Sequence, residues 1–352
     1  MLSVAFLANG SIRVPSARTR AYQFVPALQD QGIDARVLDP DALPQRLGFT
    51  RLYRLAALRA ARAADVVVIQ KQLLDRATLT SLTTVNPRLA YDFDDALYAP
   101  HDRHETSAVV MRRFRRLDLV LAKARLVIAG NHELAAYAKP RTVRVAVVPT
   151  VVDADLYARA IRPRRRGGTV VVGWTGTAAN LVYLEPLRQA IRDIQESSSV
   201  PVEFRVVCSQ PPHWPDVDVA FRRWRVDSAI DDLAEFDIGI APLPDTPWTR
   251  GKCAFKVLEY MALGLPTIAS PVGVVPSMID HGRSGFLVDG SEEWQVRLEQ
   301  LIADAQLRAR MGDAGRAEVV RRYSVHAAAP RLAQLLRSVA KPVGGRDGGR
   351  GR

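Results

Sequence analysis

The chain has 352 residues, 48% of them hydrophobic and 24% charged, which is typical of a folded globular protein and excludes an intrinsically disordered chain. This length is sufficient for two domains, each with its own core. No run of 18 apolar residues occurs and only two cysteines, Cys208 and Cys253, are present. The sequence therefore predicts no membrane-spanning helix, disulfide framework or zinc cluster.

Two features bear on location. Residues 1–11 lack the basic lead and cleavage pattern of a signal peptide, so we expect a cytoplasmic protein. The net charge of +12 lies in the first half, because residues 1–166 hold 27 Lys and Arg against 15 Asp and Glu, and the remainder holds 22 of each. This asymmetry indicates an anionic partner, such as a lipid surface, a phosphorylated acceptor or nucleic acid. A general preference for arginine on solvated faces explains the charge equally well.

In chain order, short apolar runs alternate with amphipathic segments, beginning with a strand and then a helix at residues 18–31. The strands predicted before residue 160 cover residues 2–8, 34–40, 64–70, 88–94, 124–130 and 143–149. Continuous apolar strands that alternate with helices predict a parallel sheet with both faces covered. A Pro, a basic run and a Gly pair at residues 161–168 then predict a linker.

The same alternation restarts after the linker. Predicted strands cover residues 169–176, 202–209, 236–243, 265–271 and 284–290, and predicted helices cover 292–322 and 326–340. We therefore expect an α/β protein of two Rossmann-like, doubly wound parallel-sheet domains, residues 1–163 and 168–325, with ligands in the cleft between them. The Gly- and Arg-rich residues 341–352 predict a disordered tail.

Residues 250–270 combine two lysines with an apolar helix pattern. The helical periodicity of residues 255–263 places Lys252 at or just before a helix N-terminus, where free N–H groups and the helix dipole favour an anion. Lys252 and Lys256 lie four residues apart and repel each other unless an anion such as a diphosphate lies between them. Glu259, one turn deeper, is placed to accept hydrogen bonds from two ribose hydroxyls. The alternative is an ordinary Lys256–Glu259 ion pair, worth about 0.3–0.5 kcal/mol.

Residues 251–288, GKCAFKVLEYMALGLPTIASPVGVVPSMIDHGRSGFLV, resemble the donor-binding core of GT-B glycosyltransferases of family four, the glycosyl transferases group 1 type. Glu259 matches the second Glu of the family's Glu-x7-Glu pattern, and MALGLP, SPVG and HGRSGFLV match the family's next elements. The resemblance implies the GT-B fold and a metal-independent, cofactor-free, retaining transfer of a hexosyl group from a nucleotide-diphospho sugar to an acceptor hydroxyl. It also implies that residues 326–340 pack back on the first domain.

Two positions depart from the family pattern. Gly251 occupies the place of the first Glu, whose contact with the donor sugar is then absent or supplied elsewhere. The segment GWTGTAANLVYL lacks the Arg and Lys that hold the diphosphate in relatives. We infer that Arg250, Lys252 or Lys256 supplies the missing charge.

The donor-site candidates lie in three segments: the GWTGT loop, the WRV segment beside the nucleotide base, and the basic segment before Glu259. They are Gly173, Thr175, Gly176, Thr177, Asn180, Trp224, Arg225, Val226, Arg250, Lys252, Cys253, Ala254, Phe255 and Glu259. The catalytic candidates are Lys252, Lys256 and Glu259. A tight strand-to-helix turn is the alternative role of the GWTGT loop, and a plain core position is the alternative for Trp224.

In the first domain, the strand end YDFDDALYAPHDRHE concentrates Asp92, Asp94 and Asp95. A D-x-D pair has three interpretations: metal binding, as in another glycosyltransferase fold, helix capping, or contact with a sugar in the cleft. We predict no metal, because the order of elements argues against that other fold. The candidates for acceptor or cleft contact are Gly10, Ser11, Arg18, Arg20, Asp94, Asp95 and His101.

Residues 109–125 predict an amphipathic helix with a basic face. Its apolar stripe is Val110, Phe114, Leu117 and Leu121, and the arginines that lie largely opposite are Arg112, Arg113 and Arg116. Such a helix suits an anionic membrane surface at the inner face of the plasma membrane, but equally an ordinary surface helix packed on a sheet. No nucleic-acid-binding module accompanies it.

The expected partners are therefore a nucleotide-sugar donor and an acceptor that is lipid-linked or an anionic saccharide, as in synthesis of cell-envelope glycolipids or polysaccharides. Two alternatives remain. One is a sugar-nucleotide epimerase of the same fold, and the other is a non-catalytic partner subunit that binds nucleotide.

Overall fold

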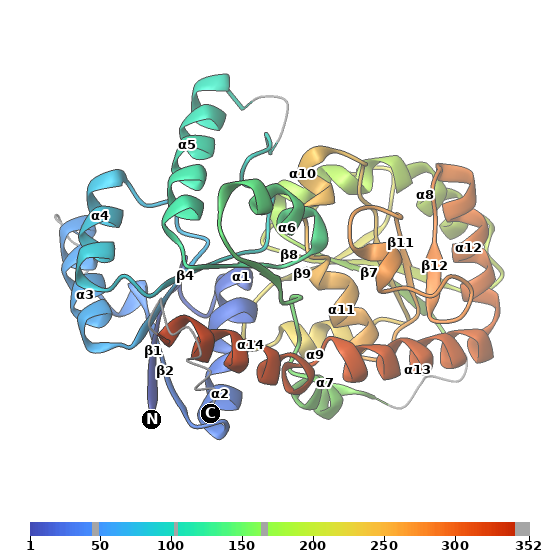
Figure 1. The fold of residues 1–352 in the computed structure, drawn as a ribbon. Helices are drawn as coiled ribbons and strands as arrows, with labels where there is room; N and C mark the ends of the chain where they lie inside the picture. The colour runs from blue at the N-terminus through green and yellow to red at the C-terminus, as the bar shows by residue number, and fades with distance from the viewer. Residues whose placement is uncertain (44–48, 102–104, 163–167, 342–352) are drawn as a thin grey trace. The chain divides into compact units, whose positions relative to one another are not determined.

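The computed structural model describes residues 1–43, 49–101, 105–162 and 168–341. The chain divides into two compact units (Figure 1). The first comprises Met1–Thr150 and the chain from Ala328 onward, and the second comprises Val151–Ala327. The division at Thr150 lies before the linker predicted at residues 161–168. Helix α7 (Ala154–Ala160), which precedes that linker, is therefore part of the second unit.

The first unit contains a six-stranded parallel sheet in the order β2-β1-β3-β4-β5-β6. Its strands are β1 (Leu2–Leu7), β2 (Ile33–Leu38), β3 (Val66–Gln70), β4 (Leu89–Phe93), β5 (Leu126–Ala129) and β6 (Val145–Val147). Every residue of β3, β4 and β5 is buried, because helices cover the central strands on both faces. The six strands predicted for this half are all present.

Most helices of the first unit connect successive strands. They are α1 (Pro15–Ala17), α2 (Phe24–Asp30), α3 (Phe49–Ala63), α4 (Arg76–Val85), α5 (Ser107–Lys123) and α6 (His132–Ala138), with α14 (Val325–Ala340) belonging here from Ala328 onward. The helix predicted at residues 18–31 is instead a π-helical turn, Arg18–Tyr22, followed by α2. Asp75 and Thr106 begin α4 and α5 by accepting hydrogen bonds from backbone N–H groups of the first turn.

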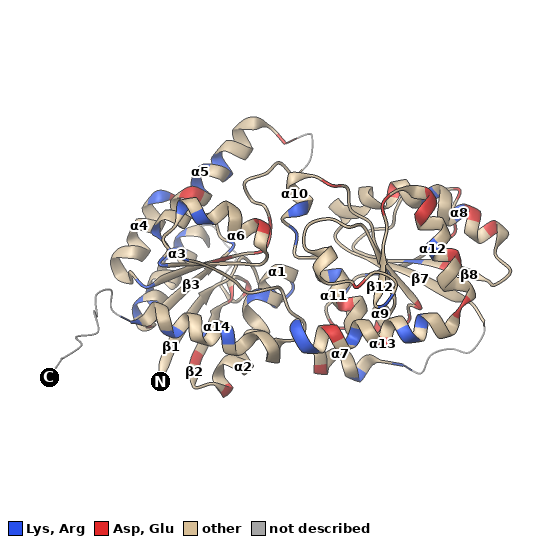
Figure 2. Ribbon diagram, turned by 45° about the vertical axis from the view of Figure 1, so that its right-hand side comes forward, with Lys and Arg blue, Asp and Glu red and all other residues tan. Residues whose placement is uncertain are grey.

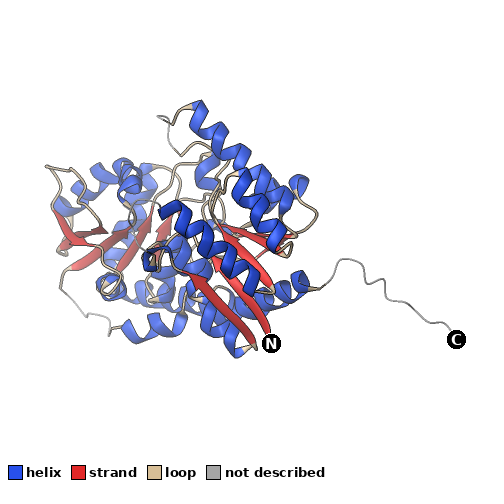
Figure 3. Ribbon diagram, turned by 90° about the vertical axis from the view of Figure 1, so that its left-hand side faces the viewer, coloured by secondary structure: helices blue, strands red, loops and turns tan. Residues whose placement is uncertain are grey.

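The second unit contains another six-stranded parallel sheet, in the order β12-β11-β10-β7-β8-β9. Its strands are β7 (Val170–Thr175), β8 (Val202–Cys208), β9 (Val219–Arg223), β10 (Ile238–Ala241), β11 (Thr267–Ala269) and β12 (Gly285–Leu287). Strand β9 was not predicted, because it is an edge strand whose residues are all at least partly exposed and end in two arginines. In both units helices cover the sheets (Figure 3), so the predicted doubly wound architecture is confirmed.

The helices of the second unit are α7, α8 (Arg188–Ser197), α9 (Ala229–Ala234), α10 (Pro247–Arg250), α11 (Phe255–Ala262), α12 (Ser291–Ala303) and α13 (Ala305–Arg322). The single helix predicted at 292–322 is divided at Asp304, whose side chain accepts a hydrogen bond from Leu307 N at 2.8 Å and so begins α13. In the described residues, no helix has both the length and the apolar character needed to cross a bilayer.

Candidate functional site

The segment that joins α10 to α11 places two lysines at the start of a buried helix. A reciprocal pair of hydrogen bonds between Thr246 and Thr249 begins α10. Ala254, the N-cap of α11, has φ +50° and ψ +40°, a left-handed conformation that costs a non-glycine residue about 1–3 kcal/mol. No side chain caps α11 at this position, so the positive end of its dipole is not offset by an N-cap oxygen.

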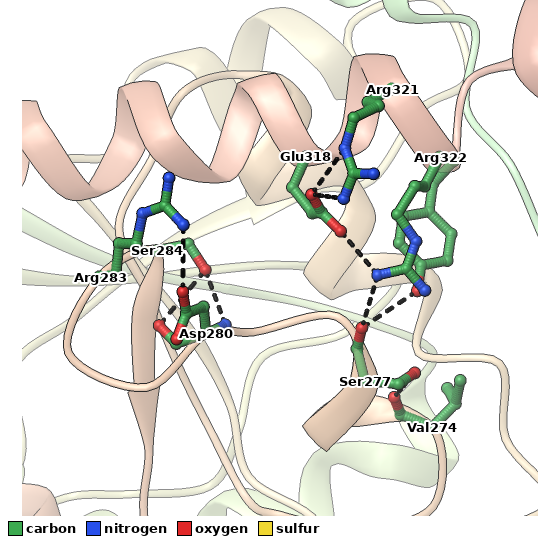
Figure 4. A network of polar contacts seen from close by, with 9 residues as sticks. Val274, Ser277, Asp280, Arg283, Ser284, Glu318, Arg321 and Arg322 are labelled. Carbon is green, nitrogen blue, oxygen red and sulfur yellow. Dashed lines mark hydrogen bonds and ion pairs between the residues drawn. The ribbon is translucent and has the colours of Figure 1, made fainter.

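The loop after β11 packs directly against this segment. Gly273 has φ +59°, and a Cβ atom there would lie 2.5 Å from the backbone oxygen of Arg250. The same loop is fixed to α13 through Ser277, whose carbonyl oxygen accepts hydrogen bonds from Arg322 and Tyr323, both at 3.3 Å (Figure 4). Glu318 holds Arg322 in place at 2.7 Å. Helix α13 thus supports the loop that fixes the backbone at the end of α10.

Lys256 is partly buried, and its ammonium group lies over an aromatic ring. Its Nζ lies 4.2 Å from the centroid of the Trp174 ring, and in the described part of the chain it forms no hydrogen bond or ion pair. Burial and the nearby charge of Lys252, opposed by Glu259, lower the pKa of Lys256 to about 7. Because no carboxylate of the described residues is paired with Lys256, its ammonium group is available to pair with a bound anion.

Glu259 is buried one turn further along α11, with 8% of its surface exposed. Its Oε1 accepts a hydrogen bond from the hydroxyl of Tyr157 at 2.7 Å. The described residues contain no Lys256–Glu259 ion pair, so the alternative of an ordinary helix salt bridge is wrong. Sequence reasoning missed Tyr157 because it lies 102 residues away in α7.

In the GWTGT loop, Gly173 and Thr175 have structural roles. The Thr175 hydroxyl donates to Val207 O at 3.1 Å, and the Thr175 N–H donates to the Tyr260 hydroxyl at 2.8 Å. A Cβ atom at Gly173 would lie 2.1 Å from the Phe236 ring. Gly173 and Thr175 therefore shape the loop, and the hydroxyl of Thr175 is used inside the sheet.

The other end of this loop lies beside Lys256. A Cβ atom at Gly176 would lie 2.6 Å from the Trp174 ring and 3.2 Å from Lys256 Nζ, so only glycine leaves room there. Asn180 donates to the Thr177 hydroxyl at 3.1 Å. Trp174 and Gly176 are thus residues of the loop that lie next to the lysine.

The other two cations of this segment, Arg250 and Lys252, have different neighbours. Arg250 is paired with Asp245 on the surface, and the side chains of both are more than half exposed. Lys252 Nζ lies 5.4 Å from the Trp248 ring. Of the three cations considered for the missing diphosphate contact, Lys256 lies over the Trp174 ring, whereas Arg250 already has a carboxylate partner.

Around these residues, Cys253 is a buried free thiol and Phe255 packs partly buried against the core. In the WRV segment, Trp224 N–H donates to Cys208 O at 2.8 Å and its ring packs partly buried against the same core. Arg225 pairs with Asp227 on the surface. Val226 is 44% exposed. The Trp224 side chain is therefore packed against the core, whereas the Val226 side chain is open to solvent.

In the first unit, two candidate residues are used by the protein itself. Arg20 is 2% exposed, and its guanidinium forms a bidentate pair with Asp92 and donates to Val148 O at 2.7 Å. The expectation that Arg20 holds an anionic acceptor does not fit this placement. Arg18 lies in the same turn, where its Nη1 donates to Ile12 O at 3.2 Å.

The loop after β1 is closed tightly. Gly10 has φ +148°, and a Cβ atom there would lie 2.4 Å from the Val14 side chain. The backbone oxygen of buried Ser11 accepts from Val14 N at 2.9 Å. His101 donates its backbone N–H to Glu105 at 2.7 Å.

Asp94 and Asp95 enclose a lysine that sequence reasoning missed. Lys71 Nζ forms ion pairs with Asp95 and, at 3.1 Å, with Asp94, whose Oδ1 also accepts from the Ser16 hydroxyl at 2.7 Å. Lys71 has φ +59°, and the two carboxylates raise its pKa. Its signal in the sequence is a lysine directly after the buried strand VVVIQ. In the part of the chain that the structure describes, no cluster of three or more His, Cys, Asp or Glu side chains is suited to a metal ion.

Parts of the chain are similar in sequence to known proteins. Residues 169–304 match the family model described as glycosyl transferases group 1. Over 251 residues the chain is 25% identical to alpha-D-kanosaminyltransferase of Streptomyces kanamyceticus, covering 68% of this chain and 62% of that protein. Over 217 residues it is 36% identical to D-inositol 3-phosphate glycosyltransferase of Corynebacterium efficiens, covering 54% and 50%. The chain thus spans less than two thirds of the length of either relative.

Solved structures show the same architecture along nearly the whole chain. Sucrose-phosphate synthase from Thermosynechococcus elongatus has a TM-score of 0.71 at 16% identity, with 96% of this chain and 99% of that chain covered. Anabaena HepE in complex with UDP and glucose has a TM-score of 0.68 at 18% identity, with 96% and 100% covered. The chain therefore has the GT-B fold, and its residues 169–304 match the family model of glycosyl transferases group 1.

Proposed function

We propose that this protein is a glycosyltransferase that moves a sugar from a nucleotide-diphospho sugar to an acceptor hydroxyl. The observation that carries the proposal is one helix on which Lys256, with no paired carboxylate among the described residues, accompanies the buried carboxylate of Glu259. Both residues lie inside the segment that matches the family model. The two curated relatives are named as glycosyltransferases, and HepE was solved with UDP and glucose, which supports a nucleotide-sugar donor.

In the proposed reaction, the bond between the sugar C1 and the diphosphate oxygen breaks, and a bond from C1 to the acceptor oxygen forms. Lys256, Lys252 and the N-terminus of α11 stabilise the negative charge that develops on the departing diphosphate. The proton of the acceptor hydroxyl passes to a departing phosphate oxygen on the same face of the sugar, which gives retention of configuration. Glu259 binds the ribose and takes no covalent part.

We also propose that transfer needs no divalent metal at Asp94 and Asp95, because an ammonium group already lies between these two carboxylates. Lys71 neutralises the place at Asp94 and Asp95 where a cation would bind. The Lys71 side chain is 14% exposed, so this charge is held within the unit. The ion pairs support a role for the two aspartates as an ordered polar end of the sheet beside Ser16.

The membrane part of the proposal rests on the first turns of α5. Among its four arginines, Arg113 is held by Glu105 and by the carbonyls of Leu97 and Ala99, so it does not belong to the solvated basic face that the sequence predicted. Arg112 and Arg115 are exposed, together with Val109 at 50% and Met111 at 47% (Figure 2 shows the charges). Exposed apolar and cationic residues on one helix favour an anionic lipid surface.

We therefore propose that the protein works at the inner face of the plasma membrane on a lipid-linked or anionic acceptor. Flotation with vesicles that contain anionic lipid, compared with neutral vesicles, tests this contact. The variant Arg112→Glu/Arg115→Glu reverses two charges without touching Arg113. Equal flotation of the variant and the wild type would contradict this part of the proposal.

The donor site is tested by thermal unfolding of the wild type and Glu259→Ala with UDP, GDP, ADP and dTDP. A ligand at about 100 times its dissociation constant adds about 2.7 kcal/mol, which raises the midpoint by several degrees. One nucleotide should shift the wild type and not the variant. Release of free nucleotide only in the presence of an acceptor identifies a transferase. Interconversion of sugar nucleotides without an acceptor identifies an epimerase. Nucleotide binding without turnover identifies a non-catalytic partner subunit.

A further inference from the structure

The hydrogen bond from Tyr157 to Glu259 joins two buried side chains. Tyr157 is 3% exposed and Glu259 is 8% exposed, and the phenol donates to Oε1 at 2.7 Å. A carboxylate of this depth is costly to ionise unless donors face it. The phenol supplies such a donor and restricts the rotation of the carboxyl group.

Tyr157 is held in place by its own element. Helix α7 begins at Asp153, whose side chain accepts from Leu156 N at 3.1 Å, and packs on α11 and α9. The chain just before it is fixed, because Val152 N donates to Tyr323 O and Val152 O accepts from Val325 N, both at 3.0 Å. The ring of Tyr157 lies in the same core cluster as Leu258 and Met261. The phenol oxygen therefore has a defined position relative to α11.

We infer that Tyr157 is the positioning residue that orients Glu259 for the ribose of the donor, an inference that rests on the proposed function of this site. A carboxylate accepts hydrogen bonds from two neighbouring hydroxyls only when its plane faces both of them. The phenol at Oε1 fixes that plane before the nucleotide arrives. Tyr157 thereby determines preference for a ribose over a 2′-deoxyribose, without touching the ligand.

The experiment measures dissociation constants by calorimetry for the nucleoside diphosphate that stabilises the wild type and for its 2′-deoxy form. We expect the wild type to prefer the ribonucleotide, and Tyr157→Phe to lower that preference by about tenfold, the size of one charge-assisted hydrogen bond. The affinity of Tyr157→Phe for the 2′-deoxy form should stay within about twofold of the wild type. A steady-state assay should show a raised KM for the donor and an unchanged kcat.

Tyr137→Phe is the matched control. Tyr137 also donates its phenol to a carboxylate, Asp118, at 3.1 Å, but in the first unit. This variant should keep the wild-type preference. Equal loss of affinity for both nucleotides in Tyr157→Phe would mean a merely structural role and overturn the inference, even though the donor site stands. If no nucleotide binds the wild type, the proposed function fails and the inference fails with it.

Discussion

Lys256 and Trp174 come from different parts of the second unit, the start of α11 and the end of β7, and they meet as a cation over an aromatic face at 4.2 Å. The indole holds the ammonium group but does not neutralise it. Gly176 completes the arrangement by leaving room beside both side chains. The protein thus keeps a cation next to a helix N-terminus, and no carboxylate of the described residues is paired with it.

The first prediction concerns pH. Because the pKa of Lys256 is about 7 in the folded protein against an ordinary value of 10.5, the unfolded chain binds more protons between these values. This residue's contribution therefore makes the free protein more stable as pH rises through that window, and a bound diphosphate reverses the trend by favouring the protonated lysine. Nucleoside diphosphate affinity should fall steeply above pH 7.5, by up to about tenfold per unit.

Calorimetric titrations from pH 7 to 9 measure this slope. Lys256→Met should bind weakly throughout and show a much shallower dependence. An equally steep slope in Lys256→Met would assign the titration to another group.

The second prediction concerns the loop after β11. Gly273→Ala combines a left-handed φ of +59° with a clash against Arg250 O, whereas Gly282→Ala has φ +81° and no atom within 4 Å of the added Cβ. Gly282→Ala should therefore cost about 1–2 kcal/mol for strain alone, and Gly273→Ala distinctly more. All five tryptophans lie between Trp174 and Trp294, so their fluorescence in a urea titration follows the unfolding of the second unit. Equal costs would show that the loop moves away freely from Arg250.

The third prediction concerns the two carboxylates that pair with Lys71. Lys71→Met removes the ammonium between Asp94 and Asp95 and leaves two adjacent carboxylates, the ligands that divalent cations prefer. Millimolar Mn²⁺ should raise the unfolding midpoint of Lys71→Met by a few degrees and leave the wild type and Lys71→Arg unchanged. A shift in the wild type would contradict the view that Lys71 occupies the cation position.

The fourth prediction concerns the buried pair of the first unit. Arg20→Ala leaves Asp92 buried without its bidentate partner, and such a loss costs about 3–5 kcal/mol. The double variant Arg20→Met/Asp92→Leu should recover most of this stability, because it removes both charges together. Hydrogen exchange of the amides of β4 measures the effect within the first unit. Recovery by Arg20→Met alone would show that Asp92 carries no charge there.

The sequence predicted the parts of the site that depend on neighbours along the chain. Glu259, Lys256 and the helix that carries them follow from one periodic segment with a glycine and a proline at its end. Tyr157 and Trp174 escaped this reasoning because tertiary packing brings them to Glu259 and Lys256, which are distant in the sequence. A single sequence does not reveal that a tyrosine in α7 faces a carboxylate in α11.

The sequence also did not predict which polar side chains the fold buries and pairs internally. Arg20 was a candidate for contact with the acceptor, but it is buried and paired with the carboxylate of Asp92 in β4. Thr175 was a candidate for the donor site, but its hydroxyl donates to a backbone oxygen of the neighbouring parallel strand β8. Asp304 shows the opposite case, because an acidic residue inside a helical pattern begins a new helix when its side chain can accept from the next turn.

Because Val152 bonds to Tyr323 and Val325, the second unit begins and ends at adjacent points of the backbone. The second unit, residues 151–327, is therefore topologically an insertion in the first unit, and its two ends lie side by side. Evolution or an engineer can therefore exchange the whole second unit by making two cuts at one place. The sequence of each unit is then free to change separately.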